Sequence, residues 1–384
     1  MSADRPIRVV FAHYTADVCG GSDKSLFLLV THLPKDRITP IMLLKDGDPM
    51  ASAYRDAGVE VHTTPVVPPR RALEPSKLLR FLVSYGPTVL RMWRIIRQCR
   101  ADAVHVNTLF NLQAPVAAWL ARRPLIWHVR EMLLGSRVYA VLCRMTALLA
   151  TRVIAISSAV AEDQWRCGNR VRKVLNGTDL RVFETLAEGG PFRAEWGIGP
   201  GQPVVTVLGR LEPWKGQHVL VEAIPAVLAV APETVFLIVG GAAVNKPEYG
   251  PSLEERCRAL GVEDHVRFTG IRRDIPEVLA ATDVLALPTV TPEPFGLTVI
   301  EAMAAARPVV ATAAGGPLDT VVDGETGLLV RPDDPTDLAE KLIQLLRDPN
   351  RARAMGERAR TRAFEHFSIT RVAREITQVL LESL

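Results

Sequence analysis

Long apolar runs are absent from this sequence. A membrane-spanning helix needs roughly 18 consecutive apolar residues, and the apolar stretch from Thr146 to Val160 is interrupted by Arg152. The first residues lead directly into an expected strand at Ile7, without the apolar core and cleavage site of a signal peptide. We therefore expect a cytoplasmic protein without a membrane-spanning segment.

Cysteine is also scarce, and the glycines form no dinucleotide motif. Five cysteines are spread over 384 residues without the spacing of a metal site or a disulfide framework. We expect reduced thiols, as is usual in the cytoplasm. The motif G-x-G-x-x-G does not occur, so the fingerprint of a dinucleotide site is missing.

What is present is the pattern of two α/β domains. Hydrophobic residues make up 48% of the chain and charged residues 23%, which is ordinary for a globular protein. A chain of this length is expected to form two domains, each with its own core. Short β-branched strands alternate with helical segments in both halves, and this alternation predicts parallel sheets with helices on both faces.

Acidic residues are nearly missing from one segment. Eight basic residues and one acid, Glu74, lie between Arg70 and Arg100, whereas the net charge of the whole chain is only +4. We expect a loop and then a helix from Ser76 that is interrupted at Gly86-Pro87. After the interruption, arginines gather opposite an apolar side, and these are Arg91, Arg94 and Arg97. This basic side is either solvated or in contact with an anionic membrane surface.

Two glutamates bracket a turn and a helix start in the stretch TPEPFGLTVIEAM. Glu293 precedes the turn, and Glu301 lies about one turn inside the helix that the apolar spacing predicts. The backbone N–H groups of Phe295, Gly296 and Leu297 would be unpaired donors at the positive end of that helix, which favours an anion. Two carboxylates beside such donors suit a ligand with both hydroxyl and phosphate groups, such as a nucleotide sugar.

A basic pair follows the first strand of the second half, at residues 204–208. Gly209-Arg210 and Lys215-Gly216 flank a short turn there. Arginine presents two parallel donors to a phosphate, and lysine adds a mobile point charge. Fixed cations of this kind stabilise a departing nucleoside diphosphate without a metal ion. We therefore assign Arg210 and Lys215 to diphosphate binding.

These motifs resemble those of the family-4 retaining glycosyltransferases of GT-B fold. The matches are Glu293-x7-Glu301, with Pro294-Phe295-Gly296 inside it, and the G-R-x-x-x-x-K-G pattern from Gly209 to Gly216. The likeness extends from the first strand to the last helix. It implies two Rossmann-like, doubly wound domains facing across a cleft. The domains expected from it are residues 1–175 on the acceptor side, 176–365 for the nucleotide sugar, and a helix at 366–384 that crosses back to the first domain.

The resemblance also gives roles to single residues. It implies that Glu301 holds the ribose hydroxyls and that Glu293 faces the hydroxyls of the donor sugar. The histidine that lies against the donor sugar in the family corresponds to His128, in the expected strand from Leu125 to Glu131. The frequent His-Asp pair is His128-Val129 here, and Arg130-Glu131 follows.

Glycine turns complete the expected site. Gly20-Gly21 occupies the place of the family's N-terminal glycine loop, with a mere tight turn as the alternative. Ile271 lies where the base of the nucleotide sits in the family. We interpret Gly315-Gly316 and the turn at Gly324 as packing turns that shape the pocket.

The function implied is that of a metal-independent retaining glycosyltransferase with a nucleoside-diphosphate sugar as donor and no other cofactor. Its expected catalytic residues are His128, Arg210, Lys215 and Glu293. Two alternatives remain open, a nucleotide-sugar epimerase of the same architecture and a non-catalytic sugar-nucleotide-binding subunit. The acceptor is expected to be a saccharide, a lipid-linked molecule of the cell envelope or a small molecule, and no nucleic acid is expected. Contact through Arg70–Arg100 would place the protein at the inner face of the membrane.

Overall fold

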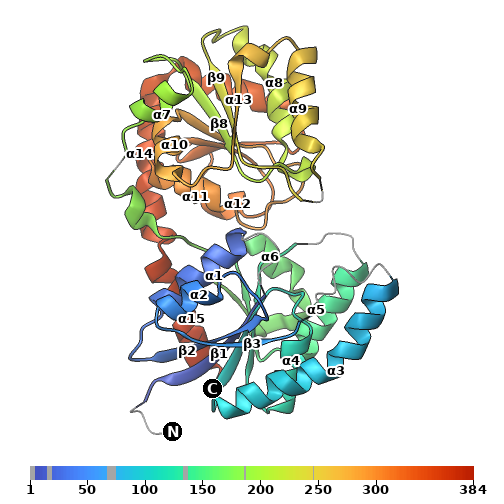
Figure 1. Cartoon of the computed structure of the whole chain (residues 1–384). Coiled ribbons are helices and arrows are strands. Elements are labelled where there is room, and N and C mark those ends of the chain that lie inside the picture. The colour runs from blue at the N-terminus through green and yellow to red at the C-terminus, as the bar shows by residue number, and fades with distance from the viewer. Residues whose placement is uncertain (1–4, 15–19, 67–74, 133–136, 186, 245) are drawn as a thin grey trace. The chain divides into compact units, whose positions relative to one another are not determined.

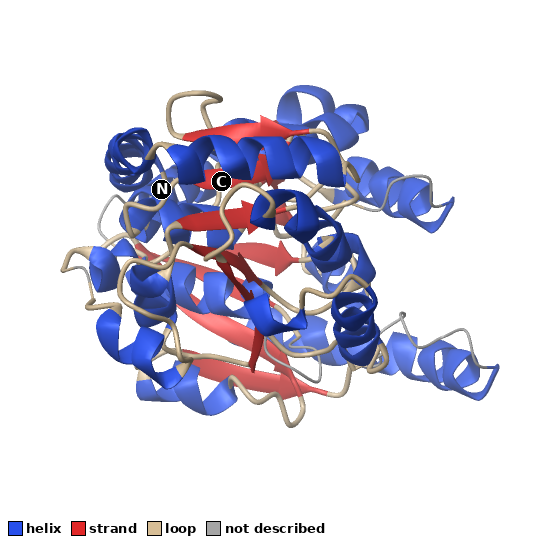
Figure 2. Ribbon diagram, turned by 90° about the horizontal axis from the view of Figure 1, so that it is seen from above, coloured by secondary structure: helices blue, strands red, loops and turns tan. Residues whose placement is uncertain are grey.

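The computed structural model describes the chain except for residues 1–4, 15–19, 67–74, 133–136, 186 and 245. The chain divides into two compact units (Figure 1), of which the first comprises Met1–Gly177 together with Ile369–Leu384, and the second Thr178–Ser368. The boundaries predicted from the sequence, after residues 175 and 365, lie close to these positions. Figure 2 shows helices on both faces of the sheets, so the predicted α/β class is confirmed.

The described part of the first unit contains a seven-stranded parallel sheet in the order β3-β2-β1-β4-β5-β6-β7. The strands are β1 (Ile7–Ala12), β2 (Ile38–Lys45), β3 (Glu60–Thr64), β4 (Ala103–Asn107), β5 (Leu125–Val129), β6 (Arg152–Ala155) and β7 (Val171–Lys173). The order reverses between β1 and β4. In open parallel sheets, ligands bind beyond the carboxyl ends of the strands at such a switch point.

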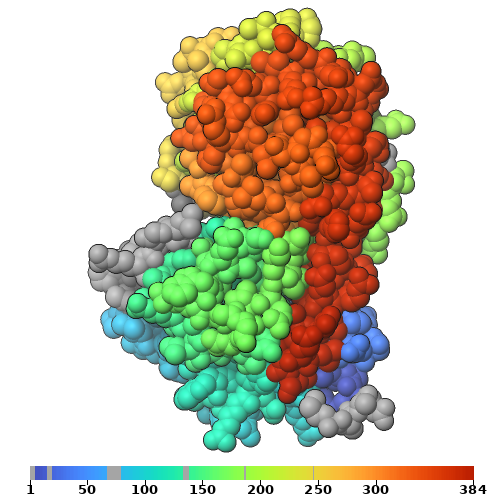
Figure 3. All heavy atoms as spheres, turned by 180° about the vertical axis from the view of Figure 1, so that it is seen from behind, coloured from blue at the N-terminus to red at the C-terminus, as the bar shows by residue number. Residues whose placement is uncertain are grey.

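Helices cover both faces of this sheet. They are α1 (Gly21–His32), α2 (Ala51–Asp56), α3 (Pro75–Gln98), α4 (Gln113–Leu120), α5 (Arg137–Leu149), α6 (Ser158–Asp163), a 3-10 helix (Trp165–Arg170) and α15 (Ile369–Glu382). The last of these joins the core of the first unit through Ile369, Val372, Ile376 and Leu380. Figure 3 shows the C-terminal segment that contains α15, in dark red, along the surface of the first unit.

The helix α3 corrects one expectation from the sequence. It runs through Pro87 without interruption. A proline removes one backbone donor from a helix, but contacts on both sides of this proline hold the helix in place. Tyr85 Oη donates to the carbonyl of Leu112, and Thr88 Oγ1 donates to the carbonyl of Pro65. Arg70 and Arg71 of the basic segment lie outside the described residues.

The expected two sides of α3 are present. Val89, Met92 and Ile96 are buried, while Arg91 and Arg94 are exposed. No helix in the described parts of the chain is both long enough and apolar enough to span a membrane.

The described part of the second unit contains a six-stranded parallel sheet in the order β10-β9-β8-β11-β12-β13. The strands are β8 (Val204–Leu208), β9 (Val235–Val239), β10 (Val266–Gly270), β11 (Val284–Leu287), β12 (Val309–Thr312) and β13 (Gly327–Val330). The order reverses between β8 and β11, which defines the switch point of this sheet.

The helices of the second unit alternate with its strands. They are α7 (Gly190–Glu195), α8 (Gln217–Leu228), α9 (Tyr249–Ala259), α10 (Ile275–Ala281), α11 (Leu297–Ala304), α12 (Pro317–Thr320), α13 (Pro335–Arg347) and α14 (Pro349–His366), with 3-10 helices at Leu180–Phe183, Pro213–Lys215 and Glu263–His265.

Candidate functional site

The predicted donor-binding residues of the second unit follow the carboxyl ends of its strands. Arg210 and Lys215 come after β8, and Glu293 comes after β11. Since β8 and β11 are neighbours and the strand order reverses between them, the basic turn and the glutamate loop meet at the switch point. This is the usual position of a ligand site in a doubly wound sheet.

An ion pair joins these two loops. Lys215 Nζ lies 2.6 Å from Glu293 Oε2 and 4.1 Å from the centre of the Trp214 ring. Glu293 is only 7% exposed. An ammonium group has three donors, so its bond to Glu293 leaves donors for a ligand anion. The structure thus brings together two residues that were assigned from separate motifs.

Arg210 lies on the open side of the same turn. Its Nε is 3.4 Å from Glu212 Oε2, and its side chain is 60% exposed. Trp214 Nε1 donates to the same carboxylate oxygen at 2.7 Å. Among the described residues, the terminal guanidinium nitrogens of Arg210 have no hydrogen-bond acceptor, so both are available to a phosphate.

The backbone of the basic turn packs directly against the loop after β11. Gly216 has a φ of +72°, and a Cβ at this position would lie 1.7 Å from the carbonyl oxygen of Pro288. No side chain fits there. The close approach requires glycine and fixes the distance between the loop that carries Lys215 and the loop that carries Glu293.

A second tight contact holds the glutamate loop from its other side. Gly315 has a φ of +77°, and a Cβ there would lie 2.1 Å from the carbonyl oxygen of Glu293. The next N–H group, that of Gly316, donates to the same carbonyl at 2.7 Å. These glycines therefore position the backbone of Glu293, in keeping with our interpretation of them as packing turns.

The start of α11 presents the expected donors. Gly296, with a φ of +86°, precedes the helix. In the described part of the chain, no hydrogen bond is found from the N–H groups of Phe295, Gly296 and Leu297. Glu301 is 7% exposed and lies about one turn inside the helix. The carboxylate and the helix N-terminus thus come from one short segment, as the sequence predicts.

Ile271 follows the edge strand β10 and is exposed. It lies against Gly241, where an added Cβ would be 2.7 Å from Ile271 Cγ1. The neighbouring Arg272 is not available to a ligand anion, because it pairs with Glu195 and Asp274. Base binding at Ile271 remains a prediction.

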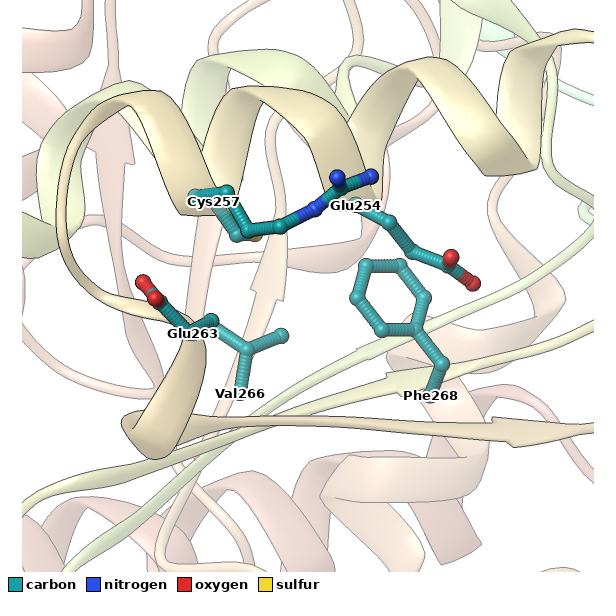
Figure 4. Close-up of a pocket in the computed structure, with 6 residues that line it drawn as sticks. Glu254, Cys257, Glu263, Val266 and Phe268 are labelled. Carbon is teal, nitrogen blue, oxygen red and sulfur yellow. The ribbon is translucent and has the colours of Figure 1, made fainter.

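A separate pocket lies beside β10, between α9 and the sheet (Figure 4). It has a volume of about 230 Å³, and Glu254, Cys257, Arg258, Glu263, Val266 and Phe268 line it. None of the predicted site residues contributes to it, and the carboxyl ends of the central strands do not reach it. We therefore do not assign the donor to this pocket.

In the first unit, His128 lies within β5 and is 1% exposed. Its Nδ1 is 3.2 Å from His105 Nε2. Burial, with the nearby charge of Arg130, keeps the pKa of His128 well below its usual range and lowers the pKa of His105 to about 3. Both rings are therefore uncharged at neutral pH. Contact of His128 with the donor sugar stays a prediction.

The sequence analysis missed a buried polar network at the carboxyl ends of β1, β4 and β5. Asp23 Oδ1 lies 2.7 Å from His13 Nε2, and Asn107 Nδ2 lies 3.2 Å from His13 Nδ1. Arg130 Nε donates to Asn107 Oδ1 at 2.6 Å. The polar residues at the end of each strand could have indicated such a network. The sequence does not show, however, which strand ends are neighbours.

The predicted glycine pair borders this network. Gly20 precedes α1 and Gly21 is its first residue, and both are exposed. The N–H group of Gly20 donates to Asp23 Oδ2 at 2.7 Å. The pair is thus a helix start held by Asp23, and its contact with the donor remains a prediction.

Two family profiles match the chain, one in each half. Residues 19–182 match the family described as Glycosyltransferase Family 4, and residues 191–362 match Glycosyl transferases group 1. Together they cover most of the described sequence, including the loops of the second unit that carry Arg210, Lys215 and Glu293.

Curated relatives and solved structures agree with these profiles. D-inositol 3-phosphate glycosyltransferase of Nocardia farcinica is 34% identical over 66% of this chain and 56% of its own length. Alpha-maltose-1-phosphate synthase of Mycolicibacterium smegmatis is 32% identical over 66% of this chain and 68% of its own length. The chain spans about half the length of most of the curated relatives it matches. The structure of HepE from Anabaena in complex with UDP and glucose has a TM-score of 0.83 and 25% identity, over 98% of this chain and all of that one.

Proposed function

Because the chain belongs to the family-4 glycosyltransferases of GT-B fold, we propose that it moves a sugar from a nucleoside-diphosphate sugar to an acceptor hydroxyl with retention of anomeric configuration. The observation that carries this proposal is the ion pair of Lys215 and Glu293 at the switch point of the second sheet. It joins a phosphate-binding cation to a carboxylate suited to sugar hydroxyls. The complex of HepE with UDP and glucose supports a nucleotide sugar as the donor.

The proposed chemistry is a substitution at the anomeric carbon. The bond from this carbon to the phosphate oxygen breaks while the bond to the acceptor oxygen forms on the same face of the sugar. The acceptor proton passes to an oxygen of the departing diphosphate. Arg210, Lys215 and the N–H groups at the start of α11 stabilise the negative charge that develops there. These donors make a divalent metal ion unnecessary in this proposal.

The direct test is a thermal-shift screen of nucleoside diphosphates and their sugars, because a ligand that binds the folded state raises the apparent melting temperature. We expect one nucleotide and its sugar to shift the wild-type protein, and the shift to be much smaller in Arg210→Ala. NMR of the product would then give its anomeric configuration. A screen without any shift, an inverted product, or turnover that a chelator abolishes and magnesium or manganese restores would reject the proposal.

Glu301 gives a prediction on donor affinity. We propose that its carboxylate accepts the ribose hydroxyls, so Glu301→Gln keeps the size of the side chain but loses charge-assisted hydrogen bonds worth about 1.5–3 kcal/mol. We expect KM for the donor to rise by about 10–100-fold, with a smaller change in kcat. A titration with deoxyribose and ribose forms of the nucleotide checks this. Equal discrimination between them by the variant and the wild type would contradict it.

The acceptor is inferred from the relatives and from α3. The names of two relatives specify D-inositol 3-phosphate and a phosphatidylinositol monomannoside. We therefore propose a phosphorylated acceptor, such as an envelope lipid or a saccharide precursor of one.

Contact with an anionic membrane surface fits this class of acceptor. On α3, the exposed side chains Leu79, Leu82, Val83 and Leu90 recur at spacings of three, four and seven, which places them on one side of the helix. The exposed arginines in the described part of α3 are Arg80, Arg91, Arg94 and Arg97. Apolar side chains beside arginines are typical of a helix that lies on an anionic membrane.

We expect Arg91→Ala/Arg94→Ala to reduce flotation with anionic liposomes. Each basic residue near such a surface contributes about 1 kcal/mol, so the partition coefficient should fall by about 30-fold. The matched control removes two exposed arginines outside α3, as Arg37→Ala/Arg55→Ala, and should float like the wild type. Wild-type protein that does not float with anionic liposomes would end this proposal.

A further inference from the structure

Arg130 is a buried cation whose hydrogen-bond partners are all neutral. It is 7% exposed. Nε donates to Asn107, and Nη1 donates to Ser25 Oγ at 3.0 Å and to Asn176 Oδ1 at 3.4 Å. Within the described part of the chain, Arg130 forms no ion pair. Burying a charge that is not directly paired is costly, so its presence calls for an explanation.

The nearby acids Glu131 and Asp23 act on Arg130 only through space, because their charges raise its pKa but neither accepts a hydrogen bond from its guanidinium. Glu131 Oε2 accepts from the N–H groups of Arg130 and Leu109, and its other oxygen accepts from Thr108 Oγ1. Asp23 has one oxygen at His13 and the other at the N–H of Gly20. Burial lowers the pKa of Arg130 to about 10, which still leaves the guanidinium charged at neutral pH.

The guanidinium is held in place but retains a free edge. Its Nε and Nη1 bonds tie it to Asn107 at the end of β4, to Ser25 on α1, and to Asn176. Among the described residues, Nη2 has no acceptor. A guanidinium offers five donors in a planar fork that fits phosphate or carboxylate. Three neutral partners therefore orient this fork without neutralising it.

Arg130 lies at the carboxyl ends of the strands, where ligands bind in sheets of this kind. It is the first residue after β5, and Asn107 and His13 connect it to the ends of β4 and β1, where the strand order reverses. His128, by contrast, is inside the strand and faces His105. We propose that Arg130 binds an oxyanion, namely the phosphate of the acceptor, and so makes the enzyme selective for phosphorylated acceptors. This inference rests on the proposed function.

Inorganic phosphate and UDP are the probes, used with the full chain at constant ionic strength in a thermal-shift titration. Arg130→Gln removes the charge while keeping hydrogen-bonding groups. Arg210→Ala removes the cation assigned to the donor diphosphate. Arg170→Gln is the matched control. Arg170 is a partly buried arginine that donates to the backbone carbonyls of Ala150 and Ala147. It lies just before the first residue of β7, whereas Arg130 follows the last residue of β5.

We expect the phosphate response to survive in Arg210→Ala and in Arg170→Gln. In Arg130→Gln, the apparent Kd for phosphate should rise by about tenfold or more, as for the loss of a charged hydrogen bond, while the UDP response stays at the wild-type level. Arg130→Lys, which keeps the charge without the fork, should retain a weakened phosphate response.

Three results would overturn the assignment. One is an unchanged phosphate response in Arg130→Gln. Another is a loss of the UDP response in that variant, which would mean that Arg130 binds the diphosphate of the donor and not the phosphate of the acceptor. The third is the absence of any phosphate response in Arg210→Ala. This result needs no variant of Arg130, so it can be obtained even if Arg130→Gln fails to fold. A wild-type protein that ignores UDP and every other nucleoside diphosphate would instead count against the proposed function.

Discussion

Lys215→Ala is expected to lower kcat by about 10²–10³-fold, the usual cost of removing one fixed donor from developing negative charge. The substitution also leaves Glu293, which is 7% exposed, without its cation, and breaking such a buried pair costs about 3 kcal/mol of stability. Turnover and melting temperature must therefore be measured together. Initial rates at saturating donor, with the protein kept well below its melting temperature, give the catalytic effect.

A double variant separates the two effects. Lys215→Ala/Glu293→Gln removes the unpaired charge, so we expect the melting temperature to recover while kcat stays low. Lys246→Ala serves as the control, because Lys246 is exposed and only 3.9 Å from the exposed Glu248, and it should leave both quantities unchanged. If the double variant regained turnover along with stability, Lys215 would have a structural role only.

Gly315→Ala is expected to be among the most destabilising single substitutions in the second unit. The left-handed backbone at φ +77° costs an alanine about 1–2 kcal/mol. The added Cβ would also lie 2.1 Å from the carbonyl oxygen of Glu293, and forcing atoms into a packed region costs about 1–3 kcal/mol more. We expect a total loss of about 2–5 kcal/mol in the free energy of unfolding, measured by denaturant titration.

The chain contains a matched control for this prediction. Gly324 has the same φ of +77°, but no atom lies within 4 Å of the Cβ that an alanine would add. The expectation from the sequence that Gly324 is a close-packed position is therefore wrong. Gly324→Ala should therefore show the backbone cost alone. Activity should fall only in Gly315→Ala, since the backbone of Glu293 must move there. Equal destabilisation of the two variants would mean that the close contact has no energetic role.

The α/β architecture could be predicted from the sequence because buried parallel strands have a simple residue pattern. Short β-branched runs, such as residues 204–208, are uniformly apolar when helices cover both faces of a sheet. The loops that carry Arg210, Lys215 and Glu293 were also found, because each has its own motif. That Lys215 and Glu293 form an ion pair could not be predicted, since it depends on which strands are neighbours.

The site of the first unit was harder to predict. The strand was expected to continue to Glu131, but it ends at Val129. Residues 128 and 130 are two apart and would share one face of a continuous strand, so the pattern of alternation does not separate them. The position of the strand end places His128 inside β5 and Arg130 just beyond it. Hydrogen bonds from Arg130 to Asn107 and Asn176, which are far away in sequence, hold its side chain there, and no local pattern reveals them. Likewise, α3 continues through Pro87, where we expected a break, because residues beside the proline form hydrogen bonds with residues outside the helix.

The placement of α15 has a consequence for the order in which the protein is made. Its apolar residues complete the core of the first unit, while the second unit is one uninterrupted segment, Thr178–Ser368. Domains generally fold as units during synthesis. The ribosome therefore synthesises every residue of the second unit before it synthesises the helix that completes the core of the first unit. The unit whose synthesis begins first is thus the last to be completed.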